Sequence, residues 1–442
     1  MTDLEIIKQL EQEIGRNLKW RGLGDEVGDN FEQILNSYTV DEKNRVIGLN
    51  LYELPLYIVP HTLMKLRNLQ ILSITDSGIN QLPDSFGKLC NLNELHLGNN
   101  SLKELPTLFG ELRNLERLYL HSNYLKKLPA SFGQLQSLVK LGLSSNELEE
   151  LPTSFGELRN LNRLYLEDNQ LKELPESFGQ LQNLSELTLH NNQLKELPES
   201  FGQLQSLKEL TLENNQLKEL PKSFGHKLQS LNYFRLESNV LEELPESFGQ
   251  LQGLDKLTLE NNRLKKLPAS FGQLQNLKEL NVSKNQLEAL PESFGQLQSL
   301  KELYLGKNQL KKLPASFGQL QSLSILGLSN NQLKALPISF GHLKNSCRFW
   351  VKYNPLENPP PHVVEKGIEA IHNYFETNAE VSTPIIESPD TEQPEKQVRL
   401  EKGKARKKQD KHRKFQLTGQ VAFCTITFLL ALLGTLKAFD II

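Results

Sequence analysis

Residues 161–183 read LNRLYLEDNQLKELPESFGQLQN, and residues 184–206 read LSELTLHNNQLKELPESFGQLQS. The two segments share their leucines, an asparagine, a proline and a Ser-Phe-Gly triplet at the same spacing, and this pattern recurs along most of the chain. Self-similarity at a fixed period of about 20 to 50 residues indicates a solenoid, in which each unit packs only on its neighbours. The repeat therefore decides the fold.

The repeats follow each other with little variation in length. Successive units begin 23 residues apart, except for one step of 24 where His226 and Lys227 replace a single residue. Val46 opens a degenerate first unit and Ser346 a truncated last one, so residues 46–345 hold thirteen full units. The opening leucines of the other units are Leu69, Leu92, Leu115, Leu138, Leu161, Leu184, Leu207, Leu231, Leu254, Leu277, Leu300 and Leu323.

Each position of the repeat has a structural reason. Leu95 and Leu97 alternate with polar residues at period two, which predicts a strand with one buried face. The asparagine column from Asn100 to Asn354 offers a donor and an acceptor to backbone groups that leave the strand ladder. The proline of each unit stands where no ladder N–H is needed. The phenylalanines from Phe86 to Phe340 are expected to stack on the convex side, and the glycine after each to permit a tight backbone turn.

The consensus reads L-x-x-L-x-L-x-x-N-x-L-x-x-L-P-x-S-F-G-x-L-x-x. Over residues 46–376 it closely resembles the leucine-rich repeat superfamily, and its 23-residue Leu-Pro form is similar to the repeats of Ras-binding scaffolds, plant intracellular Ras-group proteins and Roco proteins. The resemblance implies an α/β solenoid, a horseshoe with a parallel β-sheet along its concave side. By the same analogy, the partner would belong to a small GTPase, kinase or phosphatase assembly in signalling.

Both ends of the array need caps, because a terminal unit would otherwise expose its leucines. Residues 1–45 are predicted to form an N-terminal helical cap, in which Thr2 and Glu5 make a capping box and an amphipathic stripe follows. A second short helix is expected over residues 30–38. Residues 346–376 are predicted to hold the truncated repeat and a C-terminal capping helix. The apolar residues expected to cover the final repeat are Val364, Ile368, Ile371 and Phe375.

The composition changes after the second cap. Residues 377–416 are predicted to be a disordered linker, acidic and then basic, because they carry little that could be buried. The basic run is expected to bind anionic lipid head groups at a membrane surface. A nuclear or nucleic-acid role is the alternative for this run. Its residues are Lys402, Lys404, Arg406, Lys407, Lys408, Lys411, Arg413 and Lys414.

An apolar segment follows the basic run. Residues 417–436 carry no charge and at about 1.5 Å per residue span roughly 30 Å, so we predict a single transmembrane helix as a C-terminal anchor, with residues 437–442 as a short tail. The acidic first residues predict no secretory signal peptide, and the basic flank places the array on the cytoplasmic side of the membrane. The alternatives are a buried core helix, or a structural or adhesive surface protein whose array lies outside the cell.

No enzymatic motif accompanies the repeats. The 50 Lys and Arg residues against 53 Asp and Glu give a net charge of −3, which argues against nucleic-acid binding by the whole chain. Cys90, Cys347 and Cys424 are too far apart for a CxxC metal site. His121 and His190 share a column but lie three units apart, roughly 14 Å, which is too far to share a metal. We therefore expect no cofactor, no metal, no small-molecule substrate and no enzymatic activity.

The outward-facing strand positions differ from unit to unit, and they are the candidate binding site. A basic patch toward the N-terminal end consists of Arg117, Lys140 and Arg163. An acidic field in the middle, beside Tyr165, Tyr233 and Arg235, consists of Glu186, Glu209, Glu213, Glu237 and Glu260. Tyrosine and arginine are favoured anchors at protein interfaces. The predicted partner-binding residues on the concave face are Arg117, Tyr119, Lys140, Arg163, Tyr165, Glu186, Glu209, Glu213, Tyr233, Arg235, Glu237 and Glu260.

Charges on such a face can also serve only to keep the protein soluble. A charge reversal would separate the two interpretations, because the acidic side chains are expected to point to solvent and their replacement should spare the fold. The four positions chosen for reversal to lysine are Glu209, Glu213, Glu237 and Glu260. The sequence thus predicts a membrane-tethered, non-enzymatic scaffold that binds a protein partner on its concave side.

Overall fold

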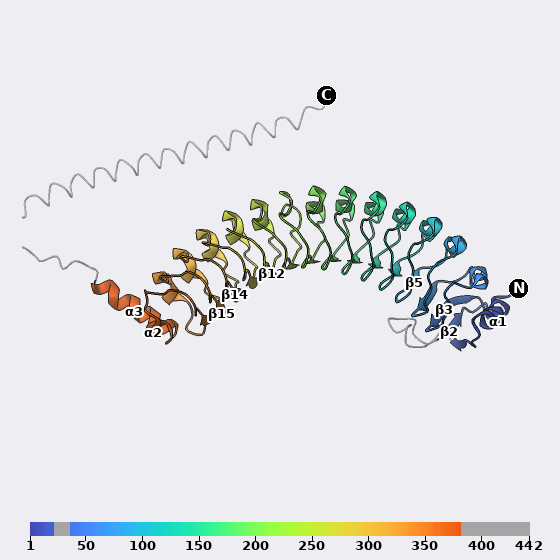
Figure 1. Cartoon of the computed structure of the whole chain (residues 1–442), viewed down its shortest axis with the longest axis horizontal. Coiled ribbons are helices and arrows are strands. Elements are labelled where there is room, and N and C mark those ends of the chain that lie inside the picture. Colours follow the sequence, from blue (N-terminus) through green and yellow to red (C-terminus); the bar gives the residue numbers. More distant parts are fainter. Residues whose placement is uncertain (22–35, 382–442) are drawn as a thin grey trace, which may run out of the picture. The chain divides into compact units, whose positions relative to one another are not determined.

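The structure, a computed structural model, describes residues 1–21 and 36–381. Residues 1–380 make up one compact unit. Within it, the strands lie side by side along the inner edge of an arc, and short helices line the outer edge (Figure 1). The basic run at residues 402–414, the predicted transmembrane helix and most of the predicted linker lie outside the described residues.

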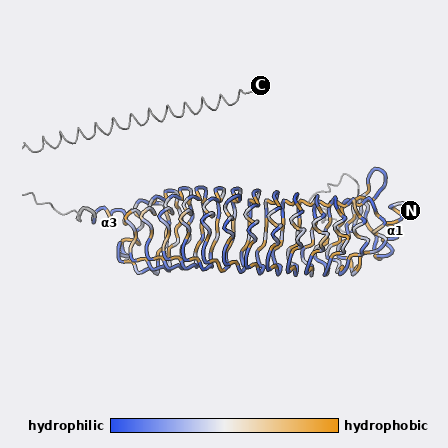
Figure 2. The backbone as a smooth tube through the Cα atoms, turned by 90° about the horizontal axis from the view of Figure 1, so that it is seen from above, coloured by the Kyte–Doolittle hydropathy of each residue, from blue (hydrophilic) through white to orange (hydrophobic). Residues whose placement is uncertain are grey.

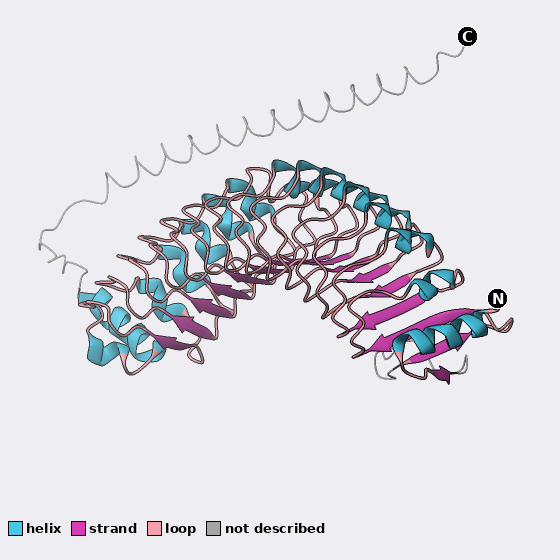
Figure 3. Cartoon of the chain, turned by 45° about the vertical axis from the view of Figure 1, so that its right-hand side comes forward, coloured by secondary structure: helices cyan, strands magenta, loops and turns pink. Residues whose placement is uncertain are grey.

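Sixteen strands of the described residues form one sheet and follow each other in sequence order (Figure 3). Neighbouring strands are parallel, apart from the antiparallel pair of β2 and β3. The strands are β1 (Lys19–Arg21), β2 (Ser37–Val40), β3 (Val46–Tyr52), β4 (Ile71–Thr75), β5 (Glu94–His96), β6 (Arg117–Tyr119), β7 (Lys140–Gly142), β8 (Arg163–Tyr165), β9 (Glu186–Thr188), β10 (Glu209–Thr211), β11 (Tyr233–Arg235), β12 (Lys256–Thr258), β13 (Glu279–Asn281), β14 (Glu302–Tyr304), β15 (Ile325–Gly327) and β16 (Arg348–Trp350).

Short 3-10 helices form the outer edge. Each helix from η3 on begins directly after the consensus proline, and the ring-fixed φ of that residue suits the entry, as at Pro198 with φ −62°. The 24-residue unit is the exception, since its residues 222–227 form turns. The helices are η2 (His61–Lys65), η3 (Asp84–Lys88), η4 (Thr107–Glu111), η5 (Ala130–Gln134), η6 (Thr153–Glu157), η7 (Glu176–Gln180), η8 (Glu199–Gln203), η9 (Glu246–Gln250), η10 (Ala269–Gln273), η11 (Glu292–Gln296), η12 (Ala315–Gln319) and η13 (Ile338–His342).

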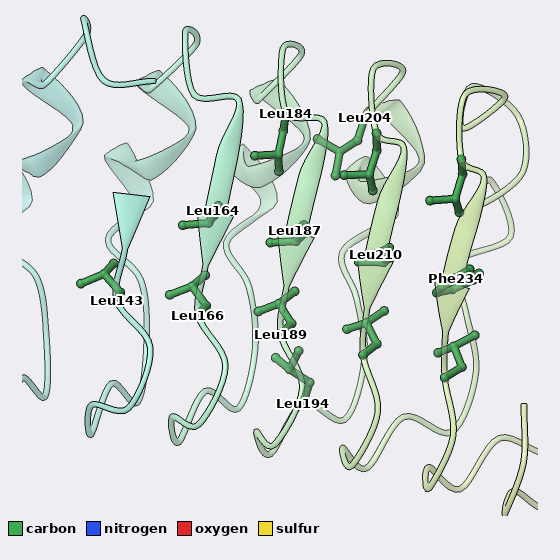
Figure 4. Packing of buried hydrophobic residues seen from close by; sticks show 14 of the residues in the cluster. Leu143, Leu164, Leu166, Leu184, Leu187, Leu189, Leu194, Leu204, Leu210 and Phe234 are labelled. Carbon is green, nitrogen blue, oxygen red and sulfur yellow. The ribbon is translucent and has the colours of Figure 1, made fainter. Parts of the chain in front are cut away.

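The consensus leucines fill the space between the sheet and the outer helices in one continuous core (Figure 4). Leu187, Leu189 and Leu194 are completely buried, as are their counterparts in the neighbouring units. The residues that separate them are polar, so hydrophobic and hydrophilic stretches alternate along every unit (Figure 2). The predicted strand with a single buried face is confirmed, and so is the solenoid.

The asparagine column makes the hydrogen bonds that the sequence predicts. Asn192 Nδ2 donates to the carbonyl oxygens of Leu166 at 3.0 Å and Leu189 at 3.1 Å, and its Oδ1 accepts from the backbone N–H of Leu171 at 3.0 Å. The same three contacts recur in the other units, for example at Asn123. Backbone groups that leave the sheet therefore find their partners in a buried side chain of the next unit.

The phenylalanine column stacks along the convex side as predicted. From Phe86 to Phe340, the ring centroids of successive units lie 5.9 to 6.5 Å apart, and almost all the rings are nearly parallel. In the unit that follows the 24-residue one, Phe234 replaces a strand leucine and packs beside the column, with its centroid 5.3 Å from that of Phe224. This extra ring fills the core where the 3-10 helix is missing.

The glycine after each phenylalanine serves a different purpose from the one predicted. None of these glycines has a positive φ, so none makes a turn that only glycine could adopt. Instead, a Cβ atom on Gly156 would lie 2.0 Å from the carbonyl oxygen of Ser177 in the next unit. The predicted reason is wrong, because the column is set by the close approach of neighbouring units.

We expect the Gly156→Ala substitution to lower the free energy of unfolding by about 1–3 kcal/mol, because the added methyl group pushes two units apart. Urea unfolding followed by circular dichroism measures the change. The matched control is Glu157→Ala, which alters an exposed neighbour and should shift stability by no more than about 0.5 kcal/mol. Equal stability of the two variants would contradict the close approach at this column.

The N-terminal end of the array is closed by α1 (Asp3–Ile14). The predicted capping box of Thr2 and Glu5 is present, and Ile6, Ile7 and Leu10 are buried. The second predicted helix is wrong in the part that the structure describes, because residues 37–40 form strand β2 and pair with β3. The sequence Ser-Tyr-Thr-Val is rich in residues that favour strands.

The other end carries α2 (Pro361–Val364) and α3 (Ile368–Val381). The four residues predicted to cover the final repeat, Val364, Ile368, Ile371 and Phe375, are buried. Helix α3 packs against the last full unit, where a Cβ atom on Gly341 would lie 2.8 Å from the Cα atom of His372. Because α3 runs to Val381, residues 377–381 of the predicted linker are helical.

Candidate functional site

The predicted site residues lie on the inner face of the sheet, on consecutive strands from β6 to β12. Each three-residue strand buries its middle residue and turns the first and third outward. Parallel in-register pairing then places corresponding residues side by side, as with Arg163 next to Glu186 and Glu186 next to Glu209. Glu213, Glu237 and Glu260 follow two residues after their strands end. The structure thus brings all twelve residues to one face.

The arginines of the basic patch are paired with carboxylates. Arg117 Nε and Nη2 donate to Glu94 Oε2 at 2.9 and 2.6 Å, and His96 Nε2 lies 2.7 Å from Glu94 Oε1. Arg163 Nε lies 3.5 Å from Glu186 Oε2. Burial would raise the pKa of Glu94, but the hydrogen bonds from His96 and Arg117 outweigh it and hold that pKa at about 2.

We expect the Glu94–Arg117 pair to make stability depend on acidity. A carboxyl that titrates near 4.5 when unfolded and near 2 when folded stabilises the protein above pH 4.5, and this contribution is lost as the pH falls toward 2. Between pH 6.5 and pH 3, the wild type should therefore lose about 2 kcal/mol more than Glu94→Gln in urea unfolding. Glu104→Gln, at an exposed position, should behave as the wild type. Equal losses for Glu94→Gln and the wild type would show that the pair contributes nothing.

The lysine of the basic patch lies between two tyrosines. Lys140 Nζ is 5.2 Å from the ring centroid of Tyr119 and 5.8 Å from that of Tyr165. The residue between the two tyrosines in the sheet is Gly142, which leaves room for the lysine chain. Burial and the nearby Glu186 carboxylate raise the pKa of Tyr165 to about 12, so this phenol stays neutral at physiological pH.

The acidic field is less exposed than the sequence predicts. Glu213 is only 6% exposed, and its Oε1 pairs with Arg235 Nη1 at 3.1 Å. Its Oε2 is buried without a hydrogen-bond partner, and burial raises the pKa of its carboxyl. The expectation that Glu213 points to solvent is wrong, because the long Arg235 side chain reaches over it from the next strand.

Two further acidic residues are bonded within the sheet. Arg235 Nε donates to Glu237 Oε1 at 2.8 Å, and Thr258 donates to the other carboxylate oxygen of Glu237. Glu260 accepts from Asn281 Nδ2 and lies beside Lys284 Nζ, both at 2.8 Å, and these contacts lower its pKa even though burial opposes them. Glu209 is exposed, and among the described residues no ion pair involves it. It is the acidic side chain best placed to meet a partner.

Sequence reasoning missed Glu94 and His96 as members of the site. They occupy the same two columns as Arg117 and Tyr119, one unit earlier. His96 stacks on Tyr119 with 4.5 Å between ring centroids. The column alignment places them next to Arg117 and Tyr119, but it does not show which side chains touch, because that depends on the rotamers.

The described residues give no sign of other chemistry. Among them, no group of three or more His, Cys, Asp and Glu side chains could hold a metal ion. Cys347 is buried, and this burial raises the pKa of its thiol to about 11, which disfavours a reactive thiolate. No helix in residues 1–21 and 36–381 is both long and apolar enough to cross a membrane.

Family models match the array over most of its length. A model described as "Leucine-rich repeat region" matches residues 117–193 and 226–309, and one described as "Leucine rich repeat" matches residues 67–125 and 172–217. A third, "Leucine Rich repeats (2 copies)", matches residues 298–344. No curated protein sequence matches the chain.

Solved structures are similar to the chain at the level of the fold and, in part, of the sequence. A leucine-rich repeat protein of Leptospira interrogans is 35% identical, with a TM-score of 0.63, over 79% of this chain and 87% of that one. The PEPR1–AtPEP1 structure is 31% identical, with a TM-score of 0.63, over 73% of this chain and 46% of that one. An internalin of Listeria monocytogenes, at 22% identity and a TM-score of 0.53 over 71% of this chain and 89% of that one, shares the fold alone.

The repeat consensus, the parallel sheet from β3 to β16 and these matches agree. The chain belongs to the leucine-rich repeat family.

Proposed function

We propose that this protein is a non-enzymatic scaffold that binds a protein partner on the inner face of its sheet. The observation that carries the proposal is the contrast between two sets of positions. Leucine, asparagine and phenylalanine recur in nearly every unit and are buried, whereas the inner-face positions change from unit to unit. Variation across this accessible face suits selective recognition, and tyrosine and arginine in it are typical interface anchors.

The PEPR1–AtPEP1 structure supports the proposal, because its name pairs the repeat-bearing relative with a second molecule. The 23-residue Leu-Pro form of the repeat further favours a partner from a small GTPase, kinase or phosphatase assembly in signalling. This finer assignment rests on the resemblance of the repeats alone.

The test is a charge swap at two exposed residues. Arg163→Glu together with Glu209→Lys reverses the charge at two inner-face positions and leaves the net charge of the protein unchanged. The control variant, Lys195→Glu with Glu150→Lys, makes the same exchange at exposed positions away from the strands. Both variants and the wild type are used to capture proteins from detergent-solubilised native membranes. Loss of a captured protein with the inner-face swap alone supports the scaffold, and identical profiles for all three would refute docking on this face.

We propose further that residues 417–436 anchor the protein in a membrane, with the basic run on anionic lipid and the array on the cytoplasmic side. The uncharged length of the segment and the eight basic residues before it support this. The full chain should float with vesicles containing phosphatidylserine, and a chain ending at residue 416 should float less. Equal flotation of the two chains would argue against the anchor.

The side of the membrane is tested separately. Protease added to intact cells should leave the array uncut if it lies in the cytoplasm. Cleavage of the array under these conditions would favour the structural or adhesive surface protein instead.

A further inference from the structure

The inner face carries two copies of one arrangement, in which a glycine lies between two aromatic residues. The first triplet is Tyr119, Gly142 and Tyr165, in register across β6, β7 and β8. The second triplet is Tyr304, Gly327 and Trp350, in register across β14, β15 and β16. Strands β14 and β15 lie near the C-terminal end of the inner row (Figure 1). All six residues are the third of their strand, so they face the same side of the sheet.

The first triplet is filled by the protein itself. Lys140, two residues before Gly142 on the same strand, places its ammonium group near both tyrosine rings, at 5.2 and 5.8 Å from the centroids. A cation within about 6 Å of an aromatic ring is attracted by the electron-rich face of that ring. The first triplet therefore shows what the space in front of the glycine can hold.

The second triplet lacks such a lysine. The residue two positions before Gly327 is Ile325, and no lysine or arginine of the described chain lies over the ring of Tyr304 or Trp350. Trp350 is 50% exposed, although it sits on the face of a sheet. A Cβ atom on Gly327 would come no closer than 3.5 Å to Tyr304, so the glycine is not required by crowding on this strand.

The charge beside the second triplet suits a cation. Glu302, in register with Ile325, accepts a hydrogen bond from the Tyr304 hydroxyl at 2.9 Å through its Oε2. Its carboxylate thus lies at the edge of the aromatic ring. Arg348 on β16 is in register with Ile325, so Glu302, Ile325 and Arg348 lie side by side across the three strands. The negative charge of this set is therefore next to Tyr304, and the positive charge is on the strand of Trp350. A carboxylate next to an aromatic face strengthens the attraction for a positive group.

We propose that the second triplet binds the cationic side chain of a lysine or arginine in an extended segment of a protein partner, as the first triplet holds Lys140. The inference rests on the proposed function and assigns the partner its chemistry: a basic side chain that enters between Tyr304 and Trp350 and approaches Glu302. The first triplet, already occupied, does not compete for it.

Fluorescence provides a direct reporter. The chain has two tryptophans, so Trp20→Phe leaves Trp350 as the sole tryptophan, which is excited selectively at a wavelength that tyrosine does not absorb. The full-length Trp20→Phe protein is titrated with four hexapeptides in which glycine alternates with lysine, arginine, leucine or glutamate. The lysine or arginine peptide should change Trp350 emission saturably, whereas the leucine and glutamate peptides should not at the same concentration. An equal response to the leucine peptide would overturn the proposal.

A second test uses a variant whose own lysine occupies the space between the two rings. Ile325→Lys recreates the first triplet and should weaken binding of the basic peptide by about tenfold or more, because the new lysine occupies the rings. Ser324→Lys adds the same charge one residue away and should keep most of the affinity. Glu302→Gln, which leaves the core untouched, should weaken binding about threefold. The proposal fails if Ile325→Lys binds as Ser324→Lys does, or, should Ile325→Lys not fold, if Glu302→Gln binds as the wild type does.

The capture assay separates this inference from the scaffold proposal. If the Arg163 and Glu209 swap loses the partner but Ile325→Lys retains it, docking on the inner face stands and the second triplet is not its cation site. If Ile325→Lys also loses the partner and Ser324→Lys does not, both hold. If the wild type captures nothing, the scaffold proposal fails, whatever the peptides do.

Discussion

We expect the Asn192→Ala substitution to lower the free energy of unfolding by about 2–5 kcal/mol. The buried amide accepts from the N–H of Leu171 and donates to the carbonyl of Leu166, both in the preceding unit. Among the hydrogen bonds of the described residues, the N–H of Leu171 has no other partner, whereas the carbonyl of Leu166 also accepts from Asn169 Nδ2. The lost bonds to carbonyls add about 1 kcal/mol each to the cost of the orphaned N–H. Each buried backbone group left without a partner costs about 1–3 kcal/mol. Urea unfolding measures the loss, and Lys195→Ala, three residues away and exposed, is the control that should change little.

A second variant separates the two halves of the amide. Asn192→Asp keeps an acceptor for the N–H of Leu171 but turns a negative oxygen toward the carbonyls of Leu166 and Leu189, so it should be at least as damaging as alanine above pH 5. Because each unit contacts only its neighbours, the loss of amide hydrogen-exchange protection should concentrate in the units around residue 192. If either variant had the wild-type free energy of unfolding, the asparagine column would not be what joins the units.

Those features of the fold that follow from backbone needs could be predicted from the sequence. The asparagine column was predictable because a chain that leaves a sheet must satisfy its N–H and carbonyl groups, and a side-chain amide offers both partners. The phenylalanine stack follows from the fixed period, since equal spacing along the chain places equal residues in contact. Both predictions hold from one end of the described array to the other.

Features that depend on distances between units could not be predicted in the same way. The glycine at position 156 is set by a carbonyl of the next unit, and the sequence does not contain that separation. The second helix, predicted over residues 30–38, is wrong at residues 37 and 38, which belong to β2. A partner strand, β3, decides their conformation.

The same distinction applies to the candidate site. The sequence determines which residues share the inner face, because parallel register follows from the repeat. It does not determine the conformations that the long side chains adopt on that face. The Arg235 side chain forms ion pairs with two carboxylates, those of Glu213 and Glu237. It covers the Glu213 carboxylate and hydrogen-bonds to that of Glu237. The acidic field thus contains groups with different exposure that look alike in the sequence.

We expect the Glu213→Lys substitution to lower the free energy of unfolding by about 3–5 kcal/mol, because it removes the partner of a half-buried arginine and sets a second cation against it. Glu213→Gln should cost less than about 1 kcal/mol, since burial already disfavours the charged carboxyl and Arg235 keeps its bond to Glu237. Glu209→Lys, on the exposed strand position four residues earlier, should leave stability unchanged within about 0.5 kcal/mol.

Thermal and urea unfolding of these three variants decide how the inner face can be tested. If Glu213→Lys unfolds early while Glu209→Lys does not, a lost partner in a multiple charge reversal that includes Glu213 reports a damaged fold and not a binding contact. Reversal at Glu209 then tests docking, because only the surface changes. If Glu213→Lys is as stable as the wild type, the Arg235 side chain does not cover that carboxylate in solution, and Glu213 joins Glu209 among the side chains that a basic partner can reach.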